Sequence, residues 1–287
     1  MRTLMIGVAL AGLLGLAGCG TAVATEGRPS WVAAAPAAPS PSASRPPEVV
    51  VSQSPSHSPA HSASPSHVPA SVVTERAPHK KKRHQDGPAD SLMKTGQAGV
   101  ALTFDDGPDP VQTPKMLDLL ARTHVKATFC LVGQNVAAHP DLVRRIAAEG
   151  HTLCNHSWRH SLTLGRQKPS VIRADLQRTN DAIRAAVPGA TIGYMRAPGG
   201  NFTPAFVAEA RKLGMTSIYW QVDPRDWEHR PGEPDGAHEA KVIRAVKKHV
   251  GKGAIVLSHD YGQPDTIRAY EKLIPWLKQR YTLIALP

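Results

Sequence analysis

Short apolar runs with strand character alternate with helical patterns from residue 98 to residue 287, and this alternation restricts the fold more than any other feature. Strands that alternate with helices form parallel sheets through right-handed crossovers. The chain therefore predicts an α/β fold. Seven strands suit a barrel-like sheet better than an open six-stranded sheet, although the pattern alone does not separate the two. The expected strands are 100–104, 126–132, 151–155, 191–195, 216–222, 254–258 and 281–286.

Helices are expected between these strands, because Pro, Thr or Ser stands at their starts and Gly at several of their ends. They begin near Thr113, Pro140, Ser170, Thr203, His238 and Thr266.

Polar side chains with catalytic potential follow five of the seven expected strands. In parallel α/β folds the carboxyl ends of the strands face one side, where such enzymes place their chemistry. Turn residues placed by chance would favour Asn, Gly and Ser instead. The sequence therefore predicts an active site built from Asp105, Asp106, His156, His160, Arg196, Asp223, Asp226 and His259.

The first of these strand ends carries two adjacent carboxylates, Asp105 and Asp106, before Gly107 and Pro108. Successive side chains of a strand point to opposite sides, so one carboxylate can face a metal and the other a substrate. A solvated turn is the simpler interpretation of the same residues.

Two histidines four residues apart, His156 and His160, suggest a metal site. On one helical turn both imidazoles would face the same way. With one carboxylate they would hold a divalent cation and leave positions open for water and substrate. Two surface histidines are the alternative, and the nearby aspartates favour the metal.

Five motifs in order resemble those of the polysaccharide deacetylases with a NodB-homology domain, carbohydrate esterase family four. They are TFDDGP at 103–108, HSWRH at 156–160, RAPGG at 196–200, DPRDW at 223–227 and LSH at 257–259. The resemblance covers residues 98–287. It implies a distorted (β/α)7 barrel of the NodB-homology type and a metal-dependent hydrolase that removes acetyl groups from N-acetylglucosamine polymers or O-acetylated sugars.

By position in these motifs, the resemblance implies that Asp106, His156 and His160 hold the metal and that Asp105 is the general base. Such a donor set accepts zinc, cobalt or nickel, and we expect zinc.

The resemblance also implies that His259 protonates the leaving amine. Its partner would be Asp226, which we favour, or Asp223. Arg196 would fix and tune Asp105 as an ion pair.

Three further positions would shape the substrate site. Trp227 and Leu257 would wall a slot for the acetyl methyl group, with ordinary core packing as the alternative. Gly199 stands where many family members carry an aromatic residue. Glycine keeps the backbone N–H that helps to hold the oxyanion, but the missing ring puts sugar stacking and substrate preference in doubt.

The N-terminal residues have the features of a secretory signal. Met1 and Arg2 precede an apolar segment that ends in Leu-Ala-Gly-Cys19, which resembles a bacterial lipobox. We expect a lipoprotein signal at 1–19, a disordered Pro/Ser/Ala-rich linker at 20–97 and the catalytic domain at 98–287. The protein would then be extracytoplasmic and held to the membrane by a lipid on Cys19. A plain secretory signal is the alternative.

The net charge of +11 does not indicate nucleic-acid binding, because the basic residues of the domain form no stripe and are not interleaved with aromatics. A cationic surface suits an anionic cell envelope. We expect a glycan substrate, a membrane contact through Cys19, and a monomer.

Cys130 and Cys154 lie in neighbouring expected strands. A disulfide suits a protein outside the cytoplasm, and two buried thiols are equally compatible with the sequence.

The expected function is deacetylation of N-acetylglucosamine-containing glycans, either peptidoglycan or chitin oligomers. An acetylxylan esterase would use nearly the same chemistry with a different groove. A non-catalytic glycan-binding module would keep the fold only, and the presence of base, metal ligands and acid together argues against it.

Overall fold

The computed structural model describes residues 86–287. The expected signal at 1–19, with Cys19, and the expected linker up to residue 85 lie outside the described residues. Within 86–287, no helix combines the length and the apolar character that a membrane span requires.

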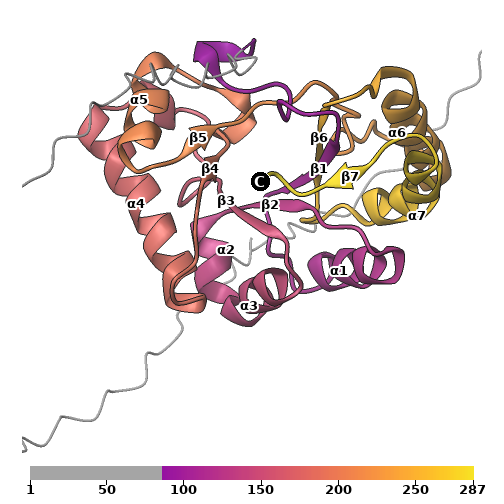
Figure 1. Cartoon of the computed structure of the whole chain (residues 1–287), viewed down its shortest axis with the longest axis horizontal. Coiled ribbons are helices and arrows are strands. Elements are labelled where there is room, and N and C mark those ends of the chain that lie inside the picture. The colour runs from indigo at the N-terminus through magenta and orange to yellow at the C-terminus, as the bar shows by residue number, and fades with distance from the viewer. Residues whose placement is uncertain (1–85) are drawn as a thin grey trace, which may run out of the picture. The chain divides into compact units, whose positions relative to one another are not determined.

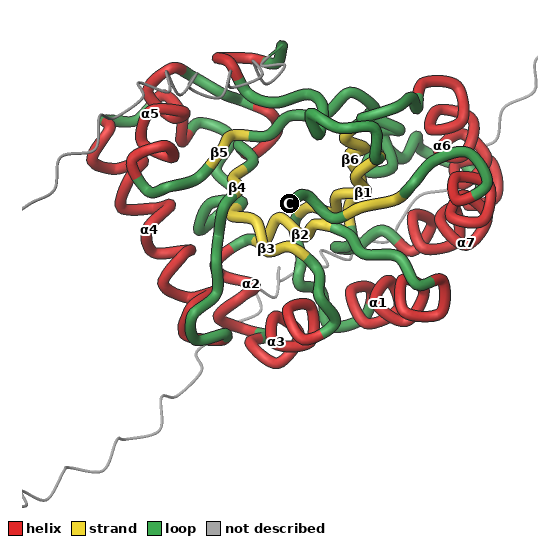
Figure 2. Tube along the Cα trace, in the orientation of Figure 1, coloured by secondary structure: helices red, strands yellow, loops and turns green. Residues whose placement is uncertain are grey.

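A curled sheet of seven parallel strands forms the centre of the domain, with helices outside it (Figures 1 and 2). Six strands follow the order β5-β4-β3-β2-β1-β6, and β7 pairs with the start of β1. The predicted distorted (β/α)7 barrel is confirmed. The strands are β1 (Val100–Asp105), β2 (Thr128–Leu131), β3 (Thr152–Asn155), β4 (Tyr194–Met195), β5 (Thr216–Ser217), β6 (Ile255–His259) and β7 (Leu283–Ile284).

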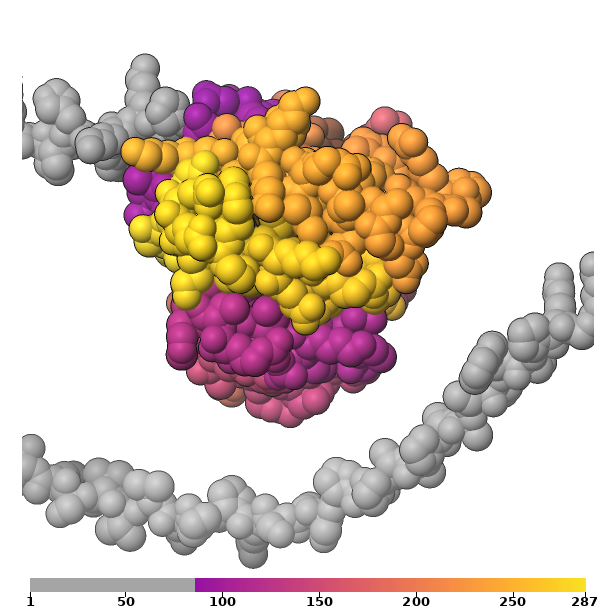
Figure 3. Space-filling model, turned by 90° about the vertical axis from the view of Figure 1, so that its right-hand side faces the viewer, coloured from indigo at the N-terminus to yellow at the C-terminus, as the bar shows by residue number. Residues whose placement is uncertain are grey.

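The helices form the outer layer, and Figure 3 views the side covered by α6 and α7, which pack against each other. Proline stands at the first position of α3, α4, α5 and α7, where its fixed φ favours a helix start. The helix α2 was not expected. The helices are α1 (Gln112–Thr123), α2 (Gly133–Ala138), α3 (Pro140–Ala148), α4 (Pro169–Ala186), α5 (Pro204–Lys212), α6 (Asp235–His249) and α7 (Pro264–Lys278).

The sheet separates two apolar clusters. Phe104 of β1 packs between the sheet and the helices, with ring centroids 5.4 Å from Phe129 and 5.2 Å from Tyr270. Ala101, on the opposite face of β1, belongs to a smaller cluster with Leu92 and Leu286. Because both faces are covered, every residue of β1 is buried, as in other parallel sheets.

The strands β4 and β5 are shorter than expected, and beyond β5 the chain changes its pairing partner. After Ser217, the backbone N–H of Tyr219 donates to the carbonyl of Leu92 at 2.7 Å. Val222 then forms an isolated bridge with Val256 of β6. The two edges of the curled sheet are thus joined by single bridges, and the barrel is distorted rather than regular.

Residues 86–97 belong to the folded domain, so the predicted boundary at residue 98 is wrong. Leu92 is buried, its N–H donates to Ser217 at 2.9 Å, and it bridges Ile218. Lys94 bridges Ala254 next to β6. The segment fills the gap between the two sheet edges. Its contacts with these edges bury it, although its few apolar residues do not predict burial.

A disulfide joins Cys130 of β2 to Cys154 of β3, which settles the alternative left open by the sequence. The two residues are register partners in adjacent parallel strands, with Cα atoms 4.2 Å apart. Both lie in the cluster inside the barrel.

Candidate active site

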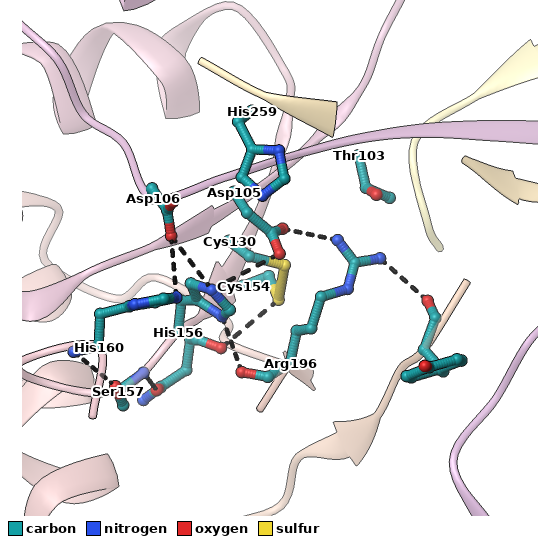
Figure 4. A network of polar contacts seen from close by, with 12 residues as sticks. Thr103, Asp105, Asp106, Cys130, Cys154, His156, Ser157, His160, Arg196 and His259 are labelled. Atoms are coloured by element: carbon teal, nitrogen blue, oxygen red, sulfur yellow. Dashed lines mark hydrogen bonds and ion pairs between the residues drawn. A yellow bond between two sulfur atoms is a disulfide. The ribbon is translucent and has the colours of Figure 1, made fainter. Parts of the chain in front are cut away.

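The end of β1 presents two carboxylates to different partners (Figure 4). Asp105 is buried, and its Oδ1 accepts from Nη1 of Arg196 at 2.6 Å. Asp106 has a positive φ of 75°, and its Oδ1 lies 3.3 Å from Nε2 of both His156 and His160. This change of direction at Asp106 turns the two carboxylates toward different partners.

The two histidines share no helical turn, so the helical explanation of their spacing is wrong. His156 follows β3 directly, and the chain then bends through positive φ values of 66° at Ser157 and 52° at His160. The hydroxyl of Ser157 accepts from the backbone N–H of His160 at 3.1 Å. This tight turn, not a helix, points both imidazoles at Asp106.

The residues present fit a divalent cation. One ligand atom from each of Asp106, His156 and His160 lies within 4.8 Å of the other two. Oδ1 of Asp106 is buried and has no hydrogen-bond partner within residues 86–287, which suits an oxygen reserved for a metal. Nδ1 of His156 donates to the Arg196 carbonyl at 2.8 Å, which leaves the lone pair on Nε2.

The electrostatic environment keeps Asp106 ionised, as a metal ligand must be. Burial raises the pKa of Asp106, but the close approach and charge of His156 and the charges of His259 and His160 outweigh it and hold that pKa far below its usual range.

The ion pair between Arg196 and Asp105 is as the sequence predicts. Arg196 follows β4 and is fully buried, and its Nη2 also donates to the carbonyl of Tyr219 at 3.0 Å. Removing one member of a buried pair costs about 3–5 kcal/mol, because an uncompensated charge is left behind. Arg196 therefore fixes Oδ1 of Asp105, while Oδ2 remains for another contact.

Asp226 is the partner of His259, and Asp223 is not. Oδ1 of Asp226 lies 2.9 Å from Nδ1 of His259, and Oδ2 accepts from the His259 backbone at 2.8 Å and from the Thr266 hydroxyl at 2.7 Å. Burial lowers the pKa of His259, but the Asp226 carboxylate outweighs burial and raises it to about 9. Asp223 accepts instead from the backbone of Arg225 at 2.8 Å and lines the cleft.

A cleft of about 500 Å³ is lined by Trp227 and Leu257 and by six of the polar residues predicted from the strand ends, Asp105, Asp106, His156, His160, Asp223 and His259. Core packing does not explain Trp227, whose side chain is 45% exposed at the rim with the Arg225 guanidinium 4.8 Å from its ring. Leu257 is buried but reaches the cleft. Trp220, which the motifs did not single out, lines the same cleft, and only its place at the end of an expected strand signals it.

Gly199 also lines the cleft, in a conformation that favours glycine. Its φ is +59°, and a Cβ added there would lie 2.9 Å from Leu162 Cδ2. Leu162, 54% exposed, thus lies next to Gly199 at this edge of the cleft.

Asp260 is a buried carboxyl group that the motifs did not identify. It follows His259, and its Oδ2 accepts from the Thr113 hydroxyl at 2.5 Å. A Cβ on Gly107 would lie 2.6 Å from Oδ1 of Asp260, so this side chain supports the turn after Asp106. Burial raises its pKa to about 7. Its position beside His259 at a strand end was the available signal.

Residues 93–218 match the family described as polysaccharide deacetylase. A chitooligosaccharide deacetylase of Bradyrhizobium sp. (strain ANU 289) is 39% identical over 199 residues, which cover 65% of this chain and 87% of the relative. The chain belongs to the polysaccharide deacetylase family. A peptidoglycan-N-acetylglucosamine deacetylase of Bacillus cereus is 34% identical over 185 residues, covering 63% of this chain and 82% of that protein.

The fold has solved counterparts. A pseudoenzyme of carbohydrate esterase family 4 from Bacillus anthracis superposes with a TM-score of 0.61 at 27% identity, covering 70% of this chain and 69% of that chain. Since that neighbour is described as a pseudoenzyme, the fold alone does not establish activity. Evidence for activity must therefore come from the individual residues of the site.

The pairing of His259 with Asp226 predicts a titration that solution NMR can follow in metal-stripped protein. The His259 ring should titrate near pH 9, because the carboxylate stabilises the imidazolium. Asp226→Asn should move this titration to a pH lower by about 1 to 3. Asp223→Asn is the matched control and should leave it in place. A shift in the Asp223 variant alone would reassign the partner.

Proposed function

We propose that this protein is a metal-dependent hydrolase that removes acetyl groups from N-acetylglucosamine-containing glycans, either peptidoglycan or chitin oligomers, in the cell envelope. The observation that carries the proposal is the convergence of Asp105, the Asp106/His156/His160 set and His259 in one cleft. A bound divalent cation, zinc in our proposal, would polarise the acetyl carbonyl and lower the pKa of a water molecule.

Asp105 is the base of the proposed reaction. Arg196 holds its Oδ1, so Oδ2 is the oxygen that takes a proton from the attacking water. The arrangement also restricts the rotation of the carboxylate, since the guanidinium of Arg196 is itself fixed by the Tyr219 carbonyl.

His259 is the acid. Asp226 holds Nδ1, so Nε2 is the nitrogen that gives a proton to the amine as the C–N bond breaks. With a pKa of about 9, the ring is protonated near neutral pH. This step is lost as the pH rises through that value, because the neutral ring carries no proton on Nε2 to donate.

The two alternative functions have less support. The relatives reported above carry the names of deacetylases acting on chitooligosaccharides and on peptidoglycan N-acetylglucosamine, which favours an amino sugar over acetylated xylan. A binding module would have no need for a carboxylate base, a set of metal ligands and a protonated acid together.

Acetate release by the purified full chain tests the reaction class. The protein is stripped of metal, resupplied with zinc, cobalt or nickel, and given N-acetylglucosamine oligomers, peptidoglycan or acetylated xylan. We expect metal-dependent release from the amino-sugar substrates. Release from xylan alone would make the protein an esterase, and glycan binding without release from any substrate would make it a binding module.

Asp105→Asn should lower kcat by about 10²- to 10⁴-fold, because the amide cannot accept the proton of the attacking water. Zinc content, measured by mass spectrometry of the metal, should stay unchanged, since the three ligands are intact. Asp118→Asn, an exposed change on α1, is the control and should keep full activity. Full activity in the Asp105 variant would exclude this base.

The proposal also covers the location of the enzyme and its oligomeric state. Cys19 in its Leu-Ala-Gly-Cys context supports a lipid anchor, and we propose a monomer. Cys19→Ala should release the protein from the membrane fraction, while Thr21→Ala should not, as immunoblots of cell fractions would show. Equal membrane retention of both variants would refute the anchor, and a dimer in light scattering would refute the monomer.

A further inference from the structure

A basic surface lies at the carboxyl ends of α6 and α7, the helices that cover the side seen in Figure 3. No Asp or Glu stands between Glu239 and Asp260, and none occurs in residues 272–287. We propose that this surface docks on the headgroups of anionic phospholipids and holds the domain on a membrane with its cleft facing away. Its six basic side chains, all exposed, are Arg244, Lys247, Lys248, Lys252, Lys278 and Arg280.

The packing of α6 against α7 makes these side chains one surface. Trp276 of α7 lies between two of them, with Nζ of Lys247 5.4 Å and Cζ of Arg280 4.3 Å from its ring centroid. On α6, the spacing of three and four residues places Arg244, Lys247 and Lys248 on one face. The sequence alone does not show the surface, because its cations come from two separate segments that only the fold brings together.

The cations of the basic surface lack counter-charges. The helix macrodipole favours a cation at a helix C-terminus, but it does not exclude a carboxylate partner. At the ends of α3 and α5 such partners are present, since Arg145 pairs with Asp118 and Glu149, and Lys212 pairs with Glu209. Within residues 86–287, none of the six cations forms an ion pair. Like charges gathered in this way repel each other, and an anionic partner would relieve the repulsion.

The basic surface and the cleft lie at opposite ends of the barrel. Lys252 stands shortly before the first residue of β6, whereas His259 at the last residue of that strand lines the cleft. Arg280 likewise stands shortly before β7. A helix that connects parallel strands ends where the next strand begins, so α6 and α7 both end on the side away from the cleft. A partner bound there leaves the cleft open.

A membrane suits this surface better than a glycan substrate does. Anionic headgroups repeat negative charge across a plane, so several separated cations can meet them at once. Trp276 and Tyr281 are at the same end, where the Tyr281 hydroxyl donates to the Val250 carbonyl at 3.2 Å. Amphipathic rings of this kind are favoured at the level of the headgroups. A glycan substrate, in contrast, must enter the cleft at the other end of the barrel.

The biological consequence rests on the proposed function and on the proposed attachment through Cys19. A domain that is tethered to a membrane can approach the bilayer in any orientation. Docking through the basic surface would select the orientation in which the cleft points outward, toward glycan beyond the membrane.

Vesicle sedimentation tests the docking. The full chain carries Cys19→Ala, so that no lipid is attached, and is mixed with vesicles of phosphatidylcholine with or without phosphatidylglycerol. We expect much tighter binding with phosphatidylglycerol, and added salt should weaken it. Arg244→Gln/Lys248→Gln/Lys252→Gln should lower the affinity by at least about tenfold, because each cation contributes about fivefold at an anionic surface.

Lys115→Gln/Arg166→Gln/Lys168→Gln in the same background is the matched control. It removes the same charge from exposed residues at or before the starts of α1 and α4, on the cleft side, and should bind as tightly as the parent. Residues 1–85 are identical in all three proteins, so a difference between them comes from the domain. Equal affinity of the basic-surface variant and the parent would overturn the proposal.

The replaced side chains of the basic surface have no hydrogen bond or ion pair within residues 86–287, so folding should be unchanged, which circular dichroism verifies. Soluble polyphosphate separates a membrane from an anionic polymer. If polyphosphate bound through the basic surface while phosphatidylglycerol vesicles did not, the partner would be a polymer and membrane docking would be wrong.

Chemical footprinting tests the orientation. Vesicles with phosphatidylglycerol should slow the acylation of Lys248 and Lys252 by a succinimidyl ester several-fold, as mass spectrometry of the peptides measures. Acylation of Lys168, on the cleft side, should keep its rate. Protection of Lys168 in place of the other two would overturn the orientation. None of these measurements uses acetate release, so a failure of docking and a failure of the proposed reaction are distinguishable.

Discussion

The buried ion pair between Asp105 and Arg196 depends on the curvature of the sheet. In the strand order, β4, which carries Arg196, is three positions away from β1. On a flat sheet the two strand ends would be separated by about 14 Å, which is far beyond the reach of an ion pair. The 2.6 Å contact exists because the sheet curls until the ends of β1 and β4 face each other across the barrel. A buried carboxylate needs such a partner, because a charge taken out of water is costly unless it is paired.

Different surroundings give chemically similar groups different tasks. Asp106 faces imidazoles and has a pKa far below its usual range, whereas Asp260, buried a short distance away with one hydroxyl donor, has a pKa of about 7. His259 is kept protonated by Asp226, while His156 offers a bare nitrogen because a backbone carbonyl takes its N–H. Base, ligand and acid are thus assigned by hydrogen-bond partners and burial rather than by residue type.

Sequence reasoning located the site better than it described its geometry. The polar residues at the strand ends and the barrel class were predictable, because strand periodicity and parallel pairing determine which ends converge. The turn that aligns His156 with His160 was not, since positive φ at non-glycine residues leaves little trace in a sequence. Asp226 and Asp223 could not be separated, because both follow the same strand and only the bend after Val222 decides which one meets His259.

The start of the domain was misplaced for a related reason. Residues 86–97 have no strong pattern of their own, and they become part of the fold by filling the gap between two sheet edges. A segment of this kind is stabilised by partners distant in the sequence, which local propensity does not report. Asp260 was missed because the sequence does not show that its side chain packs against Gly107 in the turn after Asp106.

The disulfide makes the structure beside the site depend on the redox conditions around the protein. Cys130 is the register partner of Asp105, so the covalent link between β2 and β3 lies directly beside the strand end that carries the base. Oxidising compartments maintain such bonds, and the reducing cytosol does not. In a copy of this chain with reduced thiols, β2, the neighbour of the strand that carries the base, would be joined to β3 through hydrogen bonds alone. Maturation of the barrel is in this sense coupled to the environment in which the chain completes its folding.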